Sequence, residues 1–218
     1  MDLNETVLLS AIASFGAGGY GFGYLKADVS WIRSIVKCVP VAAMAGIAAI
    51  SGGPDLLVLG LALGVVGDFF LSRESGQAFL AGLGAFLLSH VAYILLFWSL
   101  RAEFIYKPML MPMAGVIVFA LIMSAFLWRK AADFRGPVLA YIAIVMLMVL
   151  SAMVVPLGHR LITLGALLFM LSDSVLAVER FALTEGDEKL KTTPAIVWWT
   201  YVVAQAAILL GVLGAASG

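Results

Sequence analysis

The sequence predicts an all-α fold, a polytopic membrane bundle of eight transmembrane helices that forms a single transmembrane domain over residues 1–218. Of the 218 residues, 63% are hydrophobic and only 12% are charged, and the mean hydropathy is +1.10. Apolar runs of about 18 residues or more recur along the chain, and each is long enough to cross the hydrocarbon core of a bilayer. The formal net charge is zero, so nothing indicates a nucleic-acid partner.

The predicted spans follow one another with short connections. Their approximate ranges are 5–24, 34–51, 55–71, 77–99, 108–128, 136–154, 159–179 and 193–214. Asp2 and Glu5 stand at the start of the first span in place of basic residues, so we interpret it as a retained span and not as a cleaved signal peptide. The longest connection, 179–192, is too short for a separate extramembrane domain.

Lysine and arginine residues concentrate at one end of the predicted bundle. Ten of the thirteen lie in or beside the first, third, fifth and seventh connections, and the other three are Arg101, Lys107 and Arg160. Because basic residues stay on the cytoplasmic side of a membrane, we expect these four connections to be cytoplasmic and both termini to be on the non-cytoplasmic side. We therefore expect an integral, multi-pass membrane protein, in the inner membrane if the source is bacterial.

Polar side chains inside the spans fall in the cytoplasmic half of the bilayer when depth is counted at about 1.5 Å per residue. In chain order they are Lys37 in the second span, Asp68 in the third, His90 and Tyr93 in the fourth, Tyr141 in the sixth, Asp173 in the seventh, and Tyr201 and Gln205 in the eighth. We therefore predict a cavity that opens toward the cytoplasmic leaflet and has apolar walls deeper in the membrane.

Two of these residues are aspartates in matching surroundings. GLALGVVGDFFL ends at Leu71 and GALLFMLSDSVL ends at Leu176, and in each a glycine stands eight residues before the aspartate and a leucine three residues after it. An aspartate at bilayer depth costs about 2.5–3.5 kcal/mol on insertion scales, so such residues face a bundle interior or a wet cavity and are usually functional. The glycines on the same helix faces are most simply explained by close helix packing.

A pair of membrane carboxyl groups can supply both an acid and a base. Burial disfavours the charged form of a carboxyl group, and a nearby like charge disfavours it further, so one member can stay protonated while the other ionises. Such a pair suits a bond that breaks through an oxocarbenium ion, as in an acetal, a glycoside or an enol ether.

Other kinds of chemistry are less well supported by the sequence. A zinc hydrolase needs about three His, Cys or carboxylate ligands, but the chain has one cysteine, Cys38, and two histidines, of which His159 lies at the opposite membrane face. We predict no metal and no cofactor. A proton-coupled transporter of a small or lipid-like solute is the alternative, since buried Asp, His and Lys also build carriers and the repeated pattern could relate two halves of four spans. Lys37 could also simply extend to the lipid head groups.

Five segments that contain these residues resemble the YhhN/TMEM86 family, the lysoplasmalogenases. The segments are VVGDFFL, AFLLSHVAYILLF, GPVLAYIAIVMLM, GALLFMLSDSVLA and WWTYVVAQ, in this order. The resemblance implies an eight-span hydrolase that cleaves the vinyl ether bond of lysoplasmalogens, single-chain ether phospholipids, to a fatty aldehyde and a glycerophospho head group. The matching positions are Lys37, Asp68, His90, Tyr93, Tyr141, Asp173, Tyr201 and Gln205.

The residues and the resemblance together suggest a mechanism. We expect Asp173, the deeper carboxyl group, to protonate the vinyl carbon and Asp68 to activate water, although the two roles could be exchanged. His90 is expected to assist catalysis, and the substrate-binding residues are expected to be Lys37, Arg73, Tyr93, Tyr141, Tyr201 and Gln205, with Lys37 and Arg73 or Arg180 pairing with the phosphate. Head-group preference is left open, and a homo-oligomer is compatible with the sequence.

Overall fold

The structure, a computed structural model, describes residues 3–103, 106–184 and 186–216, and in these ranges it contains eight long α-helices and no strand. The helices are α1 (Leu3–Gly18), α2 (Trp31–Ile50), α3 (Asp55–Leu71), α4 (Gly76–Ser99), α5 (Leu110–Lys130), α6 (Arg135–Met153), α7 (Arg160–Ala182) and α8 (Thr193–Ala216). A π-helical segment, Gly19–Tyr24, extends α1, and short 3-10 turns precede α5 through α8. The predicted all-α class is confirmed.

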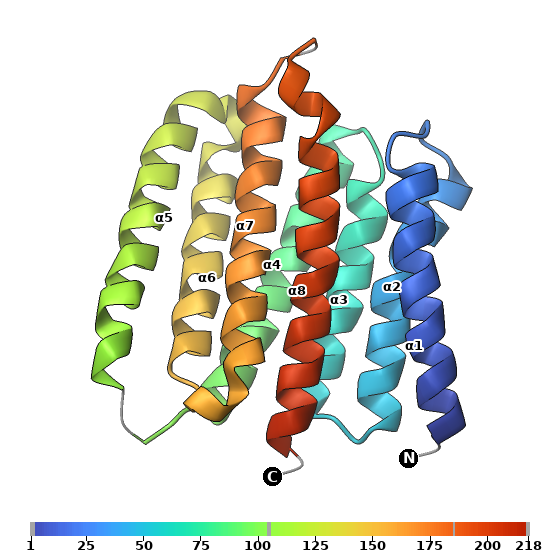
Figure 1. Cartoon of the computed structure of the whole chain (residues 1–218). Helices are drawn as coiled ribbons and strands as arrows, with labels where there is room; N and C mark the ends of the chain where they lie inside the picture. Colours follow the sequence, from blue (N-terminus) through green and yellow to red (C-terminus); the bar gives the residue numbers. More distant parts are fainter. Residues whose placement is uncertain (1–2, 104–105, 185, 217–218) are drawn as a thin grey trace.

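The helix bounds agree with the predicted spans to within about three residues. In the described part of the chain, seven helices are long and apolar enough to cross a membrane. The eighth, α3, has 17 residues, which is the lower limit for a span across a hydrocarbon core of about 30 Å. Both termini lie at the same end of the bundle, at the bottom of Figure 1, as an even number of crossings requires.

Six helices form a closed ring. Each of α2, α3, α4, α6, α7 and α8 packs against the next in that order, and α8 returns to α2. The remaining two lie outside the ring, α1 against α2 and α5 against α6 and α7 (Figure 1). The six ring helices are the ones on which the sequence places polar residues at depth, so these side chains share one interior.

Local sequence explains where several helices begin and how closely they pack. Ser30 and Ser75 cap α2 and α4, because each hydroxyl accepts a hydrogen bond from a backbone N–H three residues later, at 3.1 and 3.0 Å. Gly165 on α7 lies against the α8 backbone, where an added Cβ would come within 2.8 Å of the carbonyl oxygen of Ala204. Small residues of this kind allow membrane helices to approach closely.

Candidate active site

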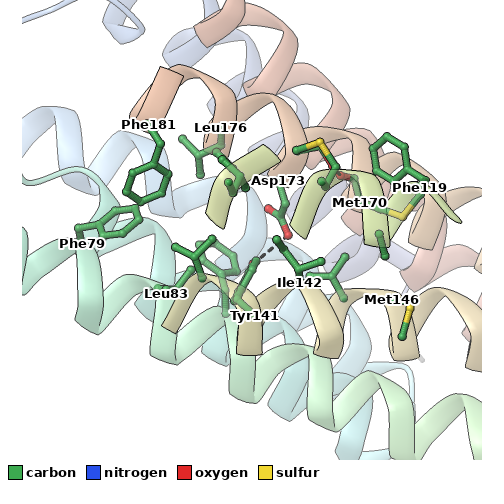
Figure 2. Close-up of a pocket in the computed structure, with 18 of the residues that line it drawn as sticks. Phe79, Leu83, Phe119, Tyr141, Ile142, Met146, Met170, Asp173, Leu176 and Phe181 are labelled. Atoms are coloured by element: carbon green, nitrogen blue, oxygen red, sulfur yellow. Dashed lines mark hydrogen bonds between the residues drawn. The ribbon is translucent and has the colours of Figure 1, made fainter. Parts of the chain in front are cut away.

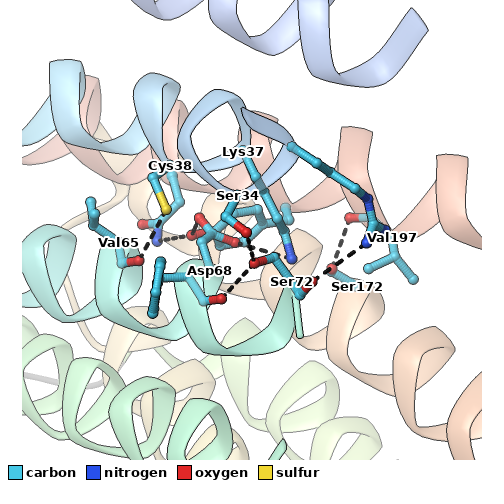
Figure 3. A network of polar contacts seen from close by, with 12 residues as sticks. Ser34, Lys37, Cys38, Val65, Asp68, Ser72, Ser172 and Val197 are labelled. Atoms are coloured by element: carbon cyan, nitrogen blue, oxygen red, sulfur yellow. Dashed lines mark hydrogen bonds and ion pairs between the residues drawn. The ribbon is translucent and has the colours of Figure 1, made fainter. Parts of the chain in front are cut away.

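Asp68 on α3 lies at the centre of a buried hydrogen-bond network. The Lys37 Nζ atom of α2 is 3.6 Å from Asp68 Oδ1, and the Tyr201 hydroxyl of α8 donates to Oδ2 at 2.8 Å. Behind Tyr201, the Gln205 amide donates to the Tyr201 hydroxyl at 3.4 Å and accepts from Tyr93 at 2.7 Å. Figure 3 shows Lys37 and Asp68 on facing helices. Asp68 therefore has a cationic partner and a fixed orientation.

Asp173 on α7 lies beside a tyrosine hydroxyl and an imidazole instead. The Tyr141 hydroxyl of α6 donates to Asp173 Oδ2 at 2.8 Å, a contact marked in Figure 2. His90 Nε2 of α4 faces the same oxygen at 3.6 Å. The Asp173 side chain is 14% exposed, whereas that of Asp68 is 2% exposed. The two carboxyl groups thus differ both in their neighbouring side chains and in how exposed they are.

The hydrogen bonds of His90 define its tautomer. Its Nδ1 atom is 2.5 Å from the carbonyl oxygen of Phe86, and because a carbonyl only accepts, Nδ1 carries the hydrogen. In a neutral ring Nε2 then has no hydrogen, and in the structure it makes no hydrogen bond. Nε2 therefore faces Asp173 Oδ2 as an unpaired buried nitrogen, 3.6 Å away and beyond hydrogen-bond distance.

Both aspartates line one polar cavity of about 240 Å³, between the ends of α2, α3, α7 and α8. Its other charged lining residues are Arg33, Lys37, Arg73, Glu74, Glu179 and Arg180. The cavity lies at the end of the bundle where most lysine and arginine residues gather. The expected meeting of the two acids around one cavity is therefore confirmed.

An apolar cavity of about 60 Å³ adjoins the polar one and lies between α4, α5, α6 and α7 (Figure 2). Its walls include Phe119, Met123, Met146 and Met170. Because methionine side chains are flexible, they can move to admit more of a chain than the present volume holds. Asp173 lines both cavities, so it stands at the boundary between charged and apolar surroundings.

The sequence-predicted site residues occupy three kinds of position. Lys37, Asp68, Arg73, Asp173 and Tyr201 line the polar cavity, and Tyr141 lines the apolar one. His90, Tyr93 and Gln205 are fully buried and line neither of these two cavities. Tyr93 and Gln205 are instead joined to Tyr201 by hydrogen bonds, Tyr93 to Gln205 and Gln205 to Tyr201, and their expected contact with substrate stays a prediction.

Several site residues were missed by the sequence analysis. Phe86 and Phe169 pack edge-on against Tyr201, with ring centroids 5.6 and 5.3 Å away. The hydroxyl groups of Ser34 and Ser72 form a hydrogen bond of 2.6 Å beside Lys37 (Figure 3). Glu179 of α7 also lines the polar cavity, but it is six residues after Asp173 and so about 120° round the helix from it, and helical periodicity gave no signal for it.

The described residues contain no group of three or more His, Cys, Asp or Glu side chains arranged to hold a metal ion. The arrangement places two carboxyl groups on the wall of the polar cavity, and one of them also lines the adjoining apolar cavity.

Comparison with known proteins gives a consistent result. The model of the YhhN family matches residues 32–212. The chain is 32% identical to the human protein "Lysoplasmalogenase TMEM86B" over 192 residues, 85% of this chain and 77% of the relative. It is 31% identical to proteins named "Lysoplasmalogenase" from Mycobacterium bovis and Mycobacterium tuberculosis, over 71% of this chain and 59% of each relative. No solved structure matches the chain.

Proposed function

Because the chain belongs to the YhhN family, we propose that it is an integral membrane hydrolase that cleaves the vinyl ether bond of lysoplasmalogens. The products are a fatty aldehyde and a glycerophospho head group. The names of its human and mycobacterial relatives support this activity.

One observation carries the proposal: Asp173 lines both the polar and the apolar cavity. A lipid with one chain that places its head group among the charged residues and its chain along the apolar wall must cross this boundary at its first linkage. The bond to be broken then lies beside Asp173, and water can reach it from the polar side, which Asp68 also lines.

We assign the acid role to Asp173 and the base role to Asp68. The Lys37 ammonium favours a charged Asp68, whereas Tyr141 and the neutral His90 leave Asp173 without a cation. A carboxyl group whose partners are neutral is the better proton donor, and a paired carboxylate the better acceptor.

The proposed cycle restores both groups. Asp173 gives its proton to the outer vinyl carbon, which leaves an oxocarbenium ion. Asp68 takes a proton from water as the water oxygen attacks this cation, and a hemiacetal forms. Asp173 then removes the hemiacetal hydroxyl proton while Asp68 protonates the departing glycerol oxygen, so that aldehyde and alcohol separate and one water has been consumed. Tyr201, supported by Gln205 and Tyr93, holds Asp68 in position throughout.

The direct test is product analysis with the detergent-purified chain. A 1-alkenyl lysophospholipid should release a fatty aldehyde detected by mass spectrometry, whereas the 1-alkyl analogue should stay intact because it has no double bond to protonate. In heavy water the aldehyde, trapped as it forms, should carry one deuterium on the carbon beside the carbonyl. Proteoliposomes that transport a solute and release no aldehyde would instead favour a carrier.

Substitution of the acids provides the matched test. Asp68→Asn and Asp173→Asn should each slow aldehyde release by at least about 100-fold, the usual contribution of a general acid or base. Asp133→Asn, on an exposed surface turn, should leave the rate unchanged. Full activity of both Asp68→Asn and Asp173→Asn would refute the mechanism.

A further inference from the structure

Two oppositely charged side chains in the polar cavity have an unpaired buried atom. In the described residues, four buried side-chain nitrogen or oxygen atoms lack a hydrogen-bond partner, and two of them, Arg73 Nη2 and Glu179 Oε2, belong to residues that line this cavity. Neither residue forms an ion pair within the described part of the chain. Buried polar atoms nearly always have partners, so each unpaired one calls for an explanation.

The other charges around the cavity are already engaged or exposed. Arg33 donates to the carbonyl oxygens of Tyr24 and Ser72 at 3.3 and 3.5 Å, and Lys37 faces Asp68. The guanidinium of Arg73 lies over the ring of Trp31, 4.1 Å from its centroid. This contact holds the guanidinium against the ring while its Nη2 atom has no partner, and a guanidinium N–H is a suitable donor to a phosphate oxygen.

A guanidinium and a carboxylate that each have an unpaired buried atom in one cavity fit a ligand that carries both charges. We propose that Glu179 is the residue that sets the head-group preference of this cavity, because its carboxylate binds the ammonium group of the substrate head group while Arg73 binds the phosphate. This inference rests on the proposed function and names its head-group specificity. A head group that ends in phosphate would place extra negative charge near Glu179 and bind less well.

The spacing along α7 agrees with this assignment. Asp173, Leu176, Glu179 and Arg180 line the cavity, and at 100° per residue they span an arc of about 120° of the helix surface, with Asp173 at one edge and Glu179 at the other. Asp173 and Glu179 are about 9 Å apart along the axis at 1.5 Å per residue. In a phosphoethanolamine lysolipid, the chain from the ether oxygen to the amine spans roughly 10 Å when extended, at about 3.5 Å for every three bonds. A lipid whose linkage lies beside Asp173 thus brings its amine to the level of Glu179 along the helix axis.

The test measures binding without turnover. The purified full-length chain is titrated with two saturated 1-alkyl lysolipids that the vinyl ether route cannot cleave, one with phosphoethanolamine and one with phosphate alone. The wild-type protein should bind the phosphoethanolamine lipid more tightly. Glu179→Gln should lower the affinity for the phosphoethanolamine lipid by about tenfold or more, because a charged hydrogen bond is lost. Its affinity for the phosphate lipid should be unchanged or higher. Glu179→Asp should keep part of the preference.

Glu188→Gln is the control, because Glu188 is 90% exposed, pairs with Lys191 and does not line the cavity. It should bind both lipids as the wild type does. A wild-type protein with no preference would overturn the inference, and so would a Glu179→Gln variant that keeps the preference or loses affinity for both lipids equally. Aldehyde release without head-group preference would refute this inference alone, whereas head-group preference without aldehyde release would refute the proposed reaction alone.

Discussion

At the scale of single residues, the two acids of the site are distinguished by their hydrogen-bond and charge partners. Asp68 has an ammonium and a phenol, and Asp173 has a phenol and an imidazole. Each therefore accepts one tyrosine hydroxyl, and the strength of that bond depends on the charge of the carboxyl group. Removing each hydroxyl in turn measures which aspartate is charged.

We expect Tyr201→Phe to destabilise the protein more than Tyr141→Phe. A hydrogen bond to a charged group contributes about 1.5–3 kcal/mol and one to a neutral group about 0.5–1.5 kcal/mol, and phenylalanine keeps the ring packing. The measurement is the thermal unfolding midpoint in detergent, with the exposed Tyr106→Phe as control. A larger loss of stability for Tyr141→Phe would mean that Asp173 is the charged aspartate, and the two catalytic roles would then be exchanged.

The sequence identified most of these residues because a charge inside an apolar span is costly and therefore conspicuous. It could not show that Tyr93 and Gln205 support Tyr201 and line neither cavity, since this depends on contacts between α4 and α8, 112 residues apart in the chain. Glu179 escaped notice because it lies near the end of its span, where a charged residue needs no special explanation.

At the scale of helices, α3 carries its glycines on the face that meets α4 and α8. A Cβ at Gly60 would lie 2.5 Å from the Tyr93 ring, and one at Gly64 would lie 2.9 Å from Gln205 Nε2 and 3.4 Å from the Tyr201 hydroxyl. These two positions thus leave room for the network that supports Asp68. The sequence assigned them to helix packing, and the structure adds what they pack against.

Gly64→Ala should lower aldehyde release by about tenfold or more while the protein still folds. The added methyl group displaces the flexible Gln205 amide, which disrupts a hydrogen bond worth about 1 kcal/mol and the position of the groups beyond it. Gly84→Ala is the matched control, because its Cβ meets nothing within 4 Å on an exposed face of α4. Unchanged activity and folding of Gly64→Ala would mean that the Gln205–Tyr201 contact is unnecessary.

At the scale of the whole molecule, the ring of six helices surrounds the two aspartates with partners in the same arrangement. The chain divides into two halves of four helices, α1–α4 and α5–α8. Each aspartate has one partner on the helix that precedes its own and a second partner on the last helix of the other half. The partners are Lys37 on α2 and Tyr201 on α8 for Asp68, and Tyr141 on α6 and His90 on α4 for Asp173. Each half therefore completes the acid site of the other, while α1 and α5 carry none of these partners.

We expect the polar cavity to open toward the cytoplasm, because ten of the thirteen lysine and arginine residues lie at its end of the bundle. In a Cys38→Ser background, a cysteine introduced at Glu188 should react with a membrane-impermeant maleimide only after cells are permeabilised. A cysteine introduced at Lys107, at the opposite end, should react in intact cells. The reverse pattern would place the cavity on the outer side.

The sequence by itself determined the membrane class, the eight helices and the depth of the acids, because hydrophobic length and the cost of a buried charge are properties of each segment alone. Only the tertiary structure decided that Lys37 pairs with Asp68, that His90 Nε2 faces Asp173, and that a polar and an apolar cavity meet at one carboxyl group. Those facts depend on the rotation and spacing of helices far apart in the chain, and close side-chain packing, not hydrophobic periodicity, sets both.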